Sequence, residues 1–336
     1  MRYVSLSLIA ALLFLPVACS PSKGVKASKP AMSKCQEQLE LIPGVAAWLR
    51  SHDQQTAEND GRPLEGLEIV LTINHMVLSK IDPQANPDDW CYTEHTVENF
   101  RKIIAALKQN DMPPTVDFMV GETIEPDMQR AWLESGNQLG NMTYSRKKPK
   151  KSDTQDFIQD IERNDQTLSA LWAKYPPKQK YFRFPGLTLS TDEQKLTQIR
   201  AYLKQKNYLE VPATVDAQDE AFSQSYCAAL SRNDQACANF IKATFKSMLL
   251  DKILKARTLT RDRAGRDVKQ ILMIKANQLT CDTLADLLSS FKAMGARFIS
   301  LDEALSDQFY AGGDVTALGN EIIEETVRAE ENEKSE

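Results

Sequence analysis

Several familiar kinds of site are missing from this sequence. No Cys-x-x-Cys pair and no cluster of cysteine and histidine occurs, which argues against a zinc finger. No Gly-x-Gly-x-x-Gly and no phosphate-binding loop follows a strand-like run, so a nucleotide site has no support. No internal repeat is present. A net charge of -5 over 336 residues gives no reason to expect nucleic acid as a partner.

An apolar run long enough to span a bilayer is also missing at the N-terminus. Residues 4–17 are almost wholly apolar, but a transmembrane helix needs about 20 residues. Arg2 precedes the run, and Ala18 and Cys19 follow it, which resembles a bacterial lipoprotein signal. We therefore expect residues 1–18 to be a signal peptide and Cys19 to carry lipid. The protein would be exported and lipid-anchored to a bacterial membrane, facing the periplasm or the cell exterior. The alternative is an ordinary secretory signal with a chance cysteine.

The segments that flank the central part have a distinct composition. Residues 19–34 are rich in serine, proline, alanine and lysine, which predicts a flexible tether. Residues 35–63 predict a small helical piece. Residues 313–336 are strongly acidic and predict a disordered tail, in which Ile322, Ile323 and Val327 form at most one apolar helical turn.

Five cysteines follow Cys19, and an exported protein can form disulfides. Cys227 and Cys237 are close in sequence and are the best candidate pair. The odd count leaves at least one cysteine free or paired elsewhere.

Strand-like and helix-like segments alternate through the centre of the chain. Most of the strand-like runs are apolar throughout, as in parallel sheets that helices cover on both faces. This pattern predicts an α/β fold, either a distorted (β/α) barrel or an open doubly wound sheet. The expected strands cover residues 67–73, 116–120, 138–143, 181–184, 209–215 (interrupted at Pro212), 270–274 and 297–300. The expected helices cover residues 96–109, 126–134, 157–174, 193–206, 220–257 and 281–294, with a short one from Asp302.

Several short motifs fall on these elements in a family-specific order. They are Phe118-Met119-Val120-Gly121, Gly140-Asn141-Met142-Thr143-Tyr144-Ser145-Arg146, Tyr181-Phe182-Arg183-Phe184-Pro185, and a final strand, helix and strand that end in Ser300-Leu301-Asp302-Glu303-Ala304-Leu305. Together they resemble the polysaccharide deacetylases with a NodB-homology domain, carbohydrate esterase family four. The resemblance covers about residues 64–312 and favours the distorted barrel of the deacetylase type.

That resemblance implies a divalent metal, often zinc, held by one aspartate and two histidines. In this chain the metal-ligand positions are His75, Met142 and Arg146. The position of the general base is Asn74, and that of the late general acid is Lys275.

Other family positions are closer to the pattern. Arg183 is retained, and Asp216 falls near the aspartate that orients this arginine. Two solvated turn aspartates, Asp216 and Asp219, are an equally good interpretation of that segment.

These replacements predict that the chain keeps the deacetylase fold but has lost deacetylase activity. A positioned acid or base contributes about 10²–10⁴ in rate, and a metal ion several kcal/mol more. Asn74 cannot accept a proton at neutral pH, Met142 is a weak ligand, and Arg146 repels a cation. No cofactor is therefore expected. Lys275 could act as a base only with a strongly depressed pKa.

The replacements also change the charge of the site. His75, Arg146, Arg183 and Lys275 form a hypothetical ligand-binding set, in which fixed cations replace the metal and suit a carboxylate or a phosphate. Unconstrained drift of these positions is the alternative.

The sequence thus predicts an inactive deacetylase-like lipoprotein. It would bind envelope polysaccharide or peptidoglycan, anionic forms included, or support a partner enzyme. Two alternatives stay open. One is an active deacetylase of atypical mechanism, which would need zinc or another divalent metal. The other is a structural lipoprotein that binds a protein through its acidic tail.

Overall fold

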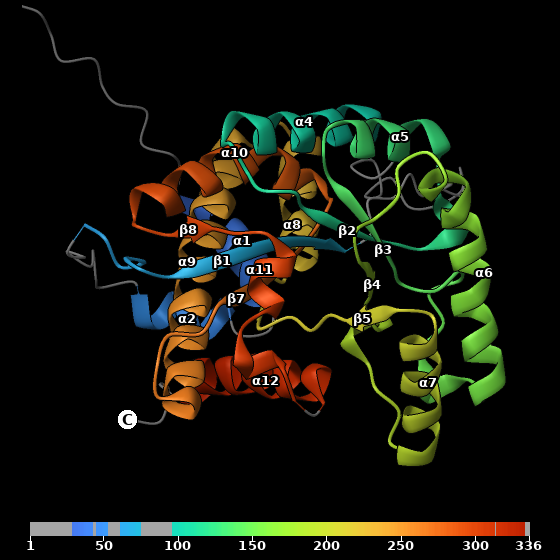
Figure 1. Cartoon of the computed structure of the whole chain (residues 1–336). Coiled ribbons are helices and arrows are strands. Elements are labelled where there is room, and N and C mark those ends of the chain that lie inside the picture. The colour runs from blue at the N-terminus through green and yellow to red at the C-terminus, as the bar shows by residue number, and fades with distance from the viewer. Residues whose placement is uncertain (1–28, 43–44, 53–60, 75–95, 313, 333–336) are drawn as a thin grey trace, which may run out of the picture.

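A computed structural model describes residues 29–42, 45–52, 61–74, 96–312 and 314–332. Its centre is an eight-stranded sheet in which neighbouring strands of the described residues pair in parallel, with helices packed around it (Figure 1). The strands are β1 (Glu68–Asn74), β2 (Val116–Met119), β3 (Gln138–Asn141), β4 (Lys180–Phe182), β5 (Tyr208–Glu210), β6 (Val215–Asp216), β7 (Gln270–Lys275) and β8 (Arg297–Phe298).

The sheet is curled into an incomplete barrel. Its strand order is β5-β4-β3-β2-β1-β7-β6, and β8 pairs with the first residues of β1 while β2 pairs with the last ones. Strands β5 and β6 end the row and do not pair with each other. The predicted mainly parallel sheet of the distorted-barrel type, covered by helices, is confirmed.

The main helices follow the predicted order. They are α4 (Thr96–Gln109), α5 (Pro126–Glu134), α6 (Thr154–Trp172), α7 (Glu193–Gln205), α8 (Asp219–Ser231), α9 (Gln235–Ala264), α10 (Gln278–Ala293) and α11 (Leu301–Leu305). Aspartate side chains accept the first free backbone N–H groups of α6, α7 and α9, which fixes where these helices begin.

Alternation along the strands sorts their side chains onto two faces. On β1, Ile69, Leu71 and Ile73 belong to the large core between sheet and helices, whereas Val70 belongs to a second cluster. That second cluster includes Phe118, Tyr181 and Ile271 and fills the inside of the curled sheet. Thr72 and Asn74 share the face of Val70, so they point into the same interior.

The stretch between β5 and β6 departs from the prediction. Residues 209–215 were expected to form one strand interrupted at Pro212, but the two halves lie at opposite ends of the sheet and the chain crosses between them. Val211 N–H donates to the carbonyl of Phe182 on β4, and Thr214 N–H donates to the carbonyl of Ile271 on β7. Pro212 lacks an N–H group for a continuous ladder, which is consistent with the break.

The acidic C-terminal segment is a helix, so the prediction of a disordered tail is wrong over α12 (Val315–Asn332). Ile322 is fully buried, and Gly319 approaches the crossing segment so closely that an added Cβ would lie 2.3 Å from the carbonyl oxygen of Ala213. Ile323 packs on Leu187, Ala213 and Met273. Helix α12 therefore covers the gap between β5 and β6 (Figure 1).

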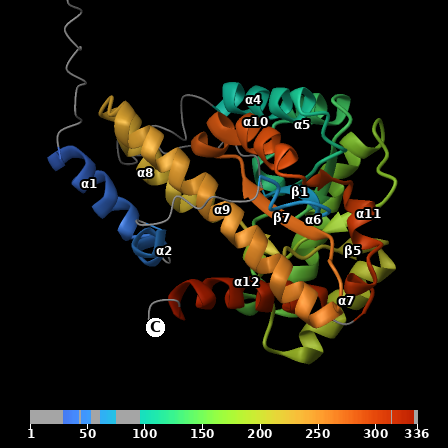
Figure 2. The same ribbon diagram turned by 90° about the vertical axis from the view of Figure 1, so that its left-hand side faces the viewer.

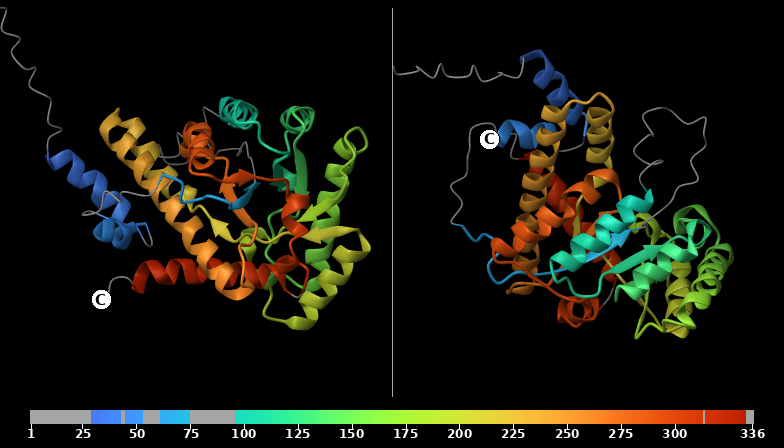
Figure 3. Two further views of the ribbon diagram at one scale, coloured as in Figure 1. Left: turned by 60° about the vertical axis from the view of Figure 1, so that its left-hand side comes forward. Right: turned by 90° about the horizontal axis from the view of Figure 1, so that it is seen from above.

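Two helices before the sheet, α1 (Lys29–Glu40) and α2 (Val45–His52), form the predicted helical N-terminal piece. Helix α1 begins inside the predicted tether, so the tether prediction is wrong from Lys29 onward. Figures 2 and 3 show α1 beside the pair α8 and α9, on the side away from the sheet.

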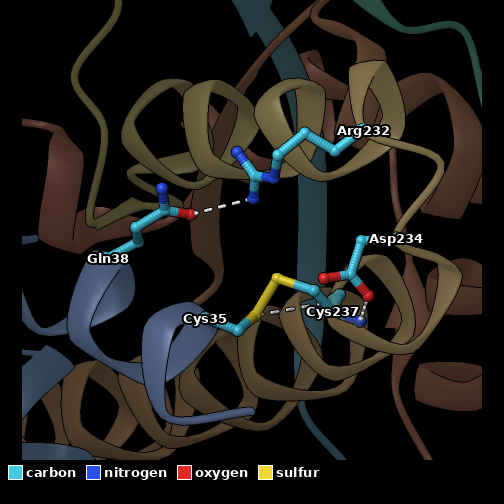
Figure 4. Close-up of a disulfide and its surroundings, with 5 residues drawn as sticks. All are labelled: Cys35, Gln38, Arg232, Asp234 and Cys237. Carbon is cyan, nitrogen blue, oxygen red and sulfur yellow. Dashed lines mark hydrogen bonds between the residues drawn. A yellow bond between two sulfur atoms is a disulfide. The ribbon is translucent and has the colours of Figure 1, made fainter. Parts of the chain in front are cut away.

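A disulfide joins Cys35 on α1 to Cys237 on α9, with their Cα atoms 5.7 Å apart (Figure 4). The predicted Cys227–Cys237 pair is therefore wrong. Cys227 is disulfide-bonded too, to a residue other than Cys237, and Cys281 is a buried free thiol. Closeness in sequence misled the prediction, because a disulfide needs closeness of Cα atoms in space.

Some predicted features fall outside the described residues. They include the signal segment, Cys19 and His75. Among the helices of the described ranges, none combines the length and the apolar character that a membrane span requires.

Candidate functional site

The family positions converge at the carboxyl ends of the strands. Asn74 ends β1 and is the register partner of Lys275, which ends β7. Met142 follows β3, and Arg183 follows β4. We call this end of the sheet the mouth. The structure brings Asn74, Arg183 and Lys275 to the mouth, while His75 lies outside the described residues.

Arg183 is fully buried, and its guanidinium lies inside the curled sheet. One terminal nitrogen donates to Thr72 Oγ1 and Asn74 Oδ1, both at 2.9 Å. The others donate to the carbonyl oxygens of Val211 (3.3 Å) and Pro212 (2.9 Å). Because these partners belong to β1 and to the crossing segment, Arg183 ties the middle of the sheet to the segment that joins β5 and β6.

The environment of Arg183 is unusual for a cation. Its guanidinium carbon lies 4.0 Å from the centre of the Phe118 ring. Among the described residues, no carboxylate accepts a hydrogen bond from it. Burial lowers the pKa of Arg183 to about 9, although the field of Asp216 acts in the opposite direction. Asp216 therefore acts on Arg183 through space, and its own Oδ1 accepts the N–H of Gln218 at 3.0 Å.

Asn74 occupies the base position with both ends of its amide engaged. Oδ1 accepts from Arg183, and Nδ2 lies 2.8 Å from the sulfur of Met273. Only 6% of the residue is exposed. A neutral amide that is held in this way offers no lone pair of useful basicity to a water molecule.

Met142 is buried in the apolar part of the barrel interior. It is 1% exposed and belongs to the apolar cluster of Val70, Phe118 and Tyr181. Neighbouring Thr143 is buried with a left-handed backbone (φ 65°), and its N–H donates to Asn141 Oδ1 at 2.8 Å. The loop after β3 is thus fixed by Asn141, while Met142 fills space.

The next turn of this loop is anchored from α6. Asp160 accepts the N–H of Ser145 at 3.0 Å and its hydroxyl at 2.9 Å. The Arg163 guanidinium lies 3.6 Å from the centre of the Tyr144 ring. This anchorage leaves Arg146 exposed, in a left-handed conformation with φ 57°.

Lys275 stands at the mouth with acids on one side and cations on the other. Its ammonium forms an ion pair with Glu220, and its backbone N–H donates to Asp219 Oδ2 at 2.8 Å. Burial lowers the pKa of Lys275, and the fields of Arg146 and Lys148 lower it further against the opposing fields of Asp219 and Asp216. Arg146 and Lys148 therefore lie within electrostatic reach of Lys275.

Asp219 is a buried carboxyl that joins three elements. Besides Lys275, its Oδ2 accepts from Asn277 Nδ2 (2.9 Å) and from Thr280 Oγ1 (2.6 Å) at the start of α10. Burial raises the pKa of Asp219 to about 6, and nearby Asp216 adds to the rise. These contacts show that Asp219 is not a solvated turn residue.

The described residues of the mouth do not form a metal centre. The described part of the chain contains no group of three or more His, Cys, Asp or Glu side chains placed to hold an ion. The buried thioether of Met142 and the cation of Arg146 are unsuited to zinc. The donor set therefore does not fit the metal that the family pattern implies.

Sequence reasoning assigned no role in this region to Asn141, Asp160 or Glu220. Asn141 was seen only as part of a motif, yet its Oδ1 also accepts from Asn164 at 2.9 Å and its Nδ2 donates to Ile161. Lys148 lies against the loop after β4, where an added Cβ on Gly186 would be 3.4 Å from its Nζ. The cluster of lysines around Lys148 was a visible signal for a charged rim.

Comparison with known proteins fits this description. Residues 87–207 match the family model for polysaccharide deacetylase, a stretch that includes Met142, Arg146 and Arg183. The predicted resemblance to polysaccharide deacetylases is thereby confirmed. A search of curated proteins gives no match.

Similar solved structures include three from carbohydrate-active proteins. A chitin deacetylase from the fungal pathogen Colletotrichum lindemuthianum is 18% identical, with a TM-score of 0.46 over 71% of this chain and 88% of that chain. The Bc1960 peptidoglycan N-acetylglucosamine deacetylase is 18% identical, with a TM-score of 0.45 over 70% and 87%. A CE4 family pseudoenzyme from Bacillus anthracis is 14% identical, with a TM-score of 0.44 over 73% and 67%. Likeness at this level carries no argument about activity.

Proposed function

We propose that this chain, which carries a polysaccharide deacetylase domain, has no deacetylase activity and binds envelope polysaccharide or peptidoglycan. The proposal rests on the burial and the hydrogen bonds of Asn74. The residue in the base position is an amide, buried and held between Arg183 and Met273. Without a base and without a metal-ligand set, the mouth cannot generate a hydrolytic water.

The charge of the mouth supports a binding role. Arg146 and Lys148 are exposed beside Lys275. Arg183 is buried and bonded to protein oxygens, so the ligand set of this proposal consists of Arg146, Lys148 and Lys275. Cations placed together at a surface attract carboxylates and phosphates, and this attraction weakens with salt. An anionic glycan of the envelope is the ligand class we propose.

Export to an oxidising compartment is part of the proposal, with lipid attached at Cys19. The Cys35–Cys237 disulfide supports it, because disulfides persist in exported proteins and are rare in the cytosol. Incorporation of labelled fatty acid into the wild type and its loss in Cys19→Ser would test the anchor.

The binding role is tested by co-sedimentation of the mature protein with purified peptidoglycan. We expect the double variant Arg146→Gln, Lys148→Gln to lose about tenfold in affinity at low salt. A matched double variant on α4, Arg101→Gln with Lys108→Gln, removes the same charge from exposed positions elsewhere. Equal binding by both double variants would refute a cationic ligand site at the mouth.

One observation favours an active hydrolase instead. Burial and neighbouring cations lower the pKa of Lys275, as an amine base would require. The ion pair with Glu220 opposes this role because it keeps the ammonium protonated. Acetate release from chitooligosaccharide by the wild type, abolished in Lys275→Met, would establish the enzyme and overturn our proposal.

A further inference from the structure

The ion pair between Lys275 and Glu220 places an acid inside the proposed ligand set. Lys275 ends β7, and Glu220 lies in the first turn of α8. Their side chains are 30% and 49% exposed, so the pair stands at the surface of the mouth. A ligand that approaches Lys275 therefore meets a carboxylate of the protein already bound there.

Glu220 differs from the two other acids whose fields act on Lys275. Asp219 is buried, and three donors hold its Oδ2. Asp216 is half-buried, and its Oδ1 accepts the N–H of Gln218 at 3.0 Å. Both of these carboxylates are fixed in the wall of the mouth, whereas that of Glu220 is exposed. Glu220 can turn into solvent without moving the start of α8, because Asp219 anchors that end of the helix to β7 and α10.

An anionic ligand and Glu220 compete for the same ammonium group. The fields of Arg146 and Lys148 act on Lys275, so the three cations form one positive region. A ligand carboxylate is attracted by this region but is repelled by Glu220. Because two like charges at one site disfavour each other, the ligand binds with full strength only after Glu220 has left Lys275. An uncharged saccharide does not replace the carboxylate, so it leaves the ion pair intact.

We propose that Glu220 is a built-in competitor, which occupies Lys275 until an anionic glycan displaces it. The inference rests on the proposed binding function and adds a regulation of the same site. One carboxylate replaces another at the same ammonium, so the net gain on binding is smaller than an unpaired lysine would give. Glu220 thereby limits the affinity of the mouth for acidic glycans and keeps their binding reversible.

Co-sedimentation of the mature protein with purified peptidoglycan tests the competition, with chitin as the uncharged polymer. We expect Glu220→Gln to bind peptidoglycan about twofold to fivefold more tightly at low salt, because no exposed ion pair has to be broken. Its binding to chitin stays unchanged. Asp286→Asn is the matched control, since it removes the acid of another surface ion pair, with Lys246, on α10 and α9. The control binds both polymers as the wild type does.

A double-mutant cycle with Lys275→Met separates displacement from a general effect of charge. Removal of any acid near the mouth favours the approach of an anion from a distance, with or without Lys275. Displacement acts only through this ammonium, so Glu220→Gln is expected to give no tightening in the Lys275→Met background. Lys275→Gln takes the place of Lys275→Met if the latter does not fold.

Tightening that is equal in both backgrounds, or an affinity of Glu220→Gln equal to that of the wild type, overturns the competition. Failure of the proposed function looks different, because the mouth variant Arg146→Gln, Lys148→Gln then binds peptidoglycan as its matched control does. A weakened mouth variant beside an unchanged Glu220→Gln variant refutes the competition alone and leaves the ligand site in place.

Discussion

Arg183 and Asn74, 109 positions apart in the chain, meet in a 2.9 Å hydrogen bond inside the curled sheet. The bond occupies the oxygen of the amide that stands in the base position. It also satisfies a cation that is fully buried. The pair therefore makes a structural connection at the point where the family pattern implies proton transfer.

Removal of this amide is expected to destabilise the fold. Asn74→Ala removes one of the two acceptors of a buried charged nitrogen, which costs about 1–3 kcal/mol of unfolding free energy. Urea denaturation measures the change. Asn239→Ala is the matched control, because Asn239 is exposed and its Oδ1 accepts from Gln235 on the same helix. Equal stability of the two variants would mean that the Arg183–Asn74 bond contributes nothing.

Replacement of the missing ligands is expected to create a metal site. The variant Asn74→Asp, His75→Asp, Met142→His, Arg146→His carries the aspartate, base and histidine pattern of the family. After dialysis we expect it to retain about one zinc per chain, because three protein ligands suffice for a catalytic zinc.

The same variant with Met142 left in place serves as its control, because it has one ligand fewer. Both are measured by elemental mass spectrometry beside the wild type. Stoichiometric zinc in the dialysed wild type would contradict our account of the mouth.

The raised pKa of Asp219, about 6, predicts a specific pH dependence. The folded state takes up this proton more readily than the unfolded state, whose carboxyl titrates near 3.8. The stabilisation from protonation is therefore complete below the unfolded pKa and is lost as the pH rises through 6.

Asp219→Asn removes this dependence, because the amide does not titrate. We expect the difference in unfolding free energy, wild type minus variant, to increase as the pH falls from 7 to 5. Urea unfolding at several pH values measures it. A difference that stays constant over this interval would show that the pKa of Asp219 is not raised.

The contact between α12 and the crossing segment predicts that position 319 requires glycine. Gly319→Ala places a methyl group against the carbonyl oxygen of Ala213, and overpacking of this kind costs about 1–3 kcal/mol. Gly312→Ala is the matched control, since an added Cβ there meets nothing within 4 Å. Thermal unfolding compares the two. Higher stability of Gly319→Ala, from its better helix propensity alone, would mean that α12 is not closely packed there.

Most elements of the fold were predictable from local pattern. The apolar run of β1 and the helical periodicity of α4 each mark an element that buries one or both faces in the main core. The strand at residues 209–215 was misjudged because local propensity cannot tell which neighbour each half of a run pairs with. Only the hydrogen bonds of Val211 and Thr214 to opposite ends of the sheet reveal the crossing.

Composition misled the prediction for the C-terminal segment. Some of the acidic residues of α12 lie on its outer side. Two of them, Glu321 and Glu325, form ion pairs with Arg263. Few residues of α12 are buried. The helix approaches the crossing segment most closely at Gly319, and a glycine adds no apolar side chain that would predict a buried helix. The mouth residues were placed by motif resemblance, but the burial of Arg183 and the partner of Lys275 depend on tertiary contacts that no local pattern reports.

The position of α12 at the end of the sequence affects the order in which parts of the fold can form. The ribosome makes it after every strand that it covers, so the side chains of Ala213 and Met273 lack their outer cover until that segment emerges. A nascent chain would present this uncovered seam to chaperones or to neighbouring chains. The apolar cluster of Leu187, Ala213 and Met273 can therefore be covered only after α12 has been made.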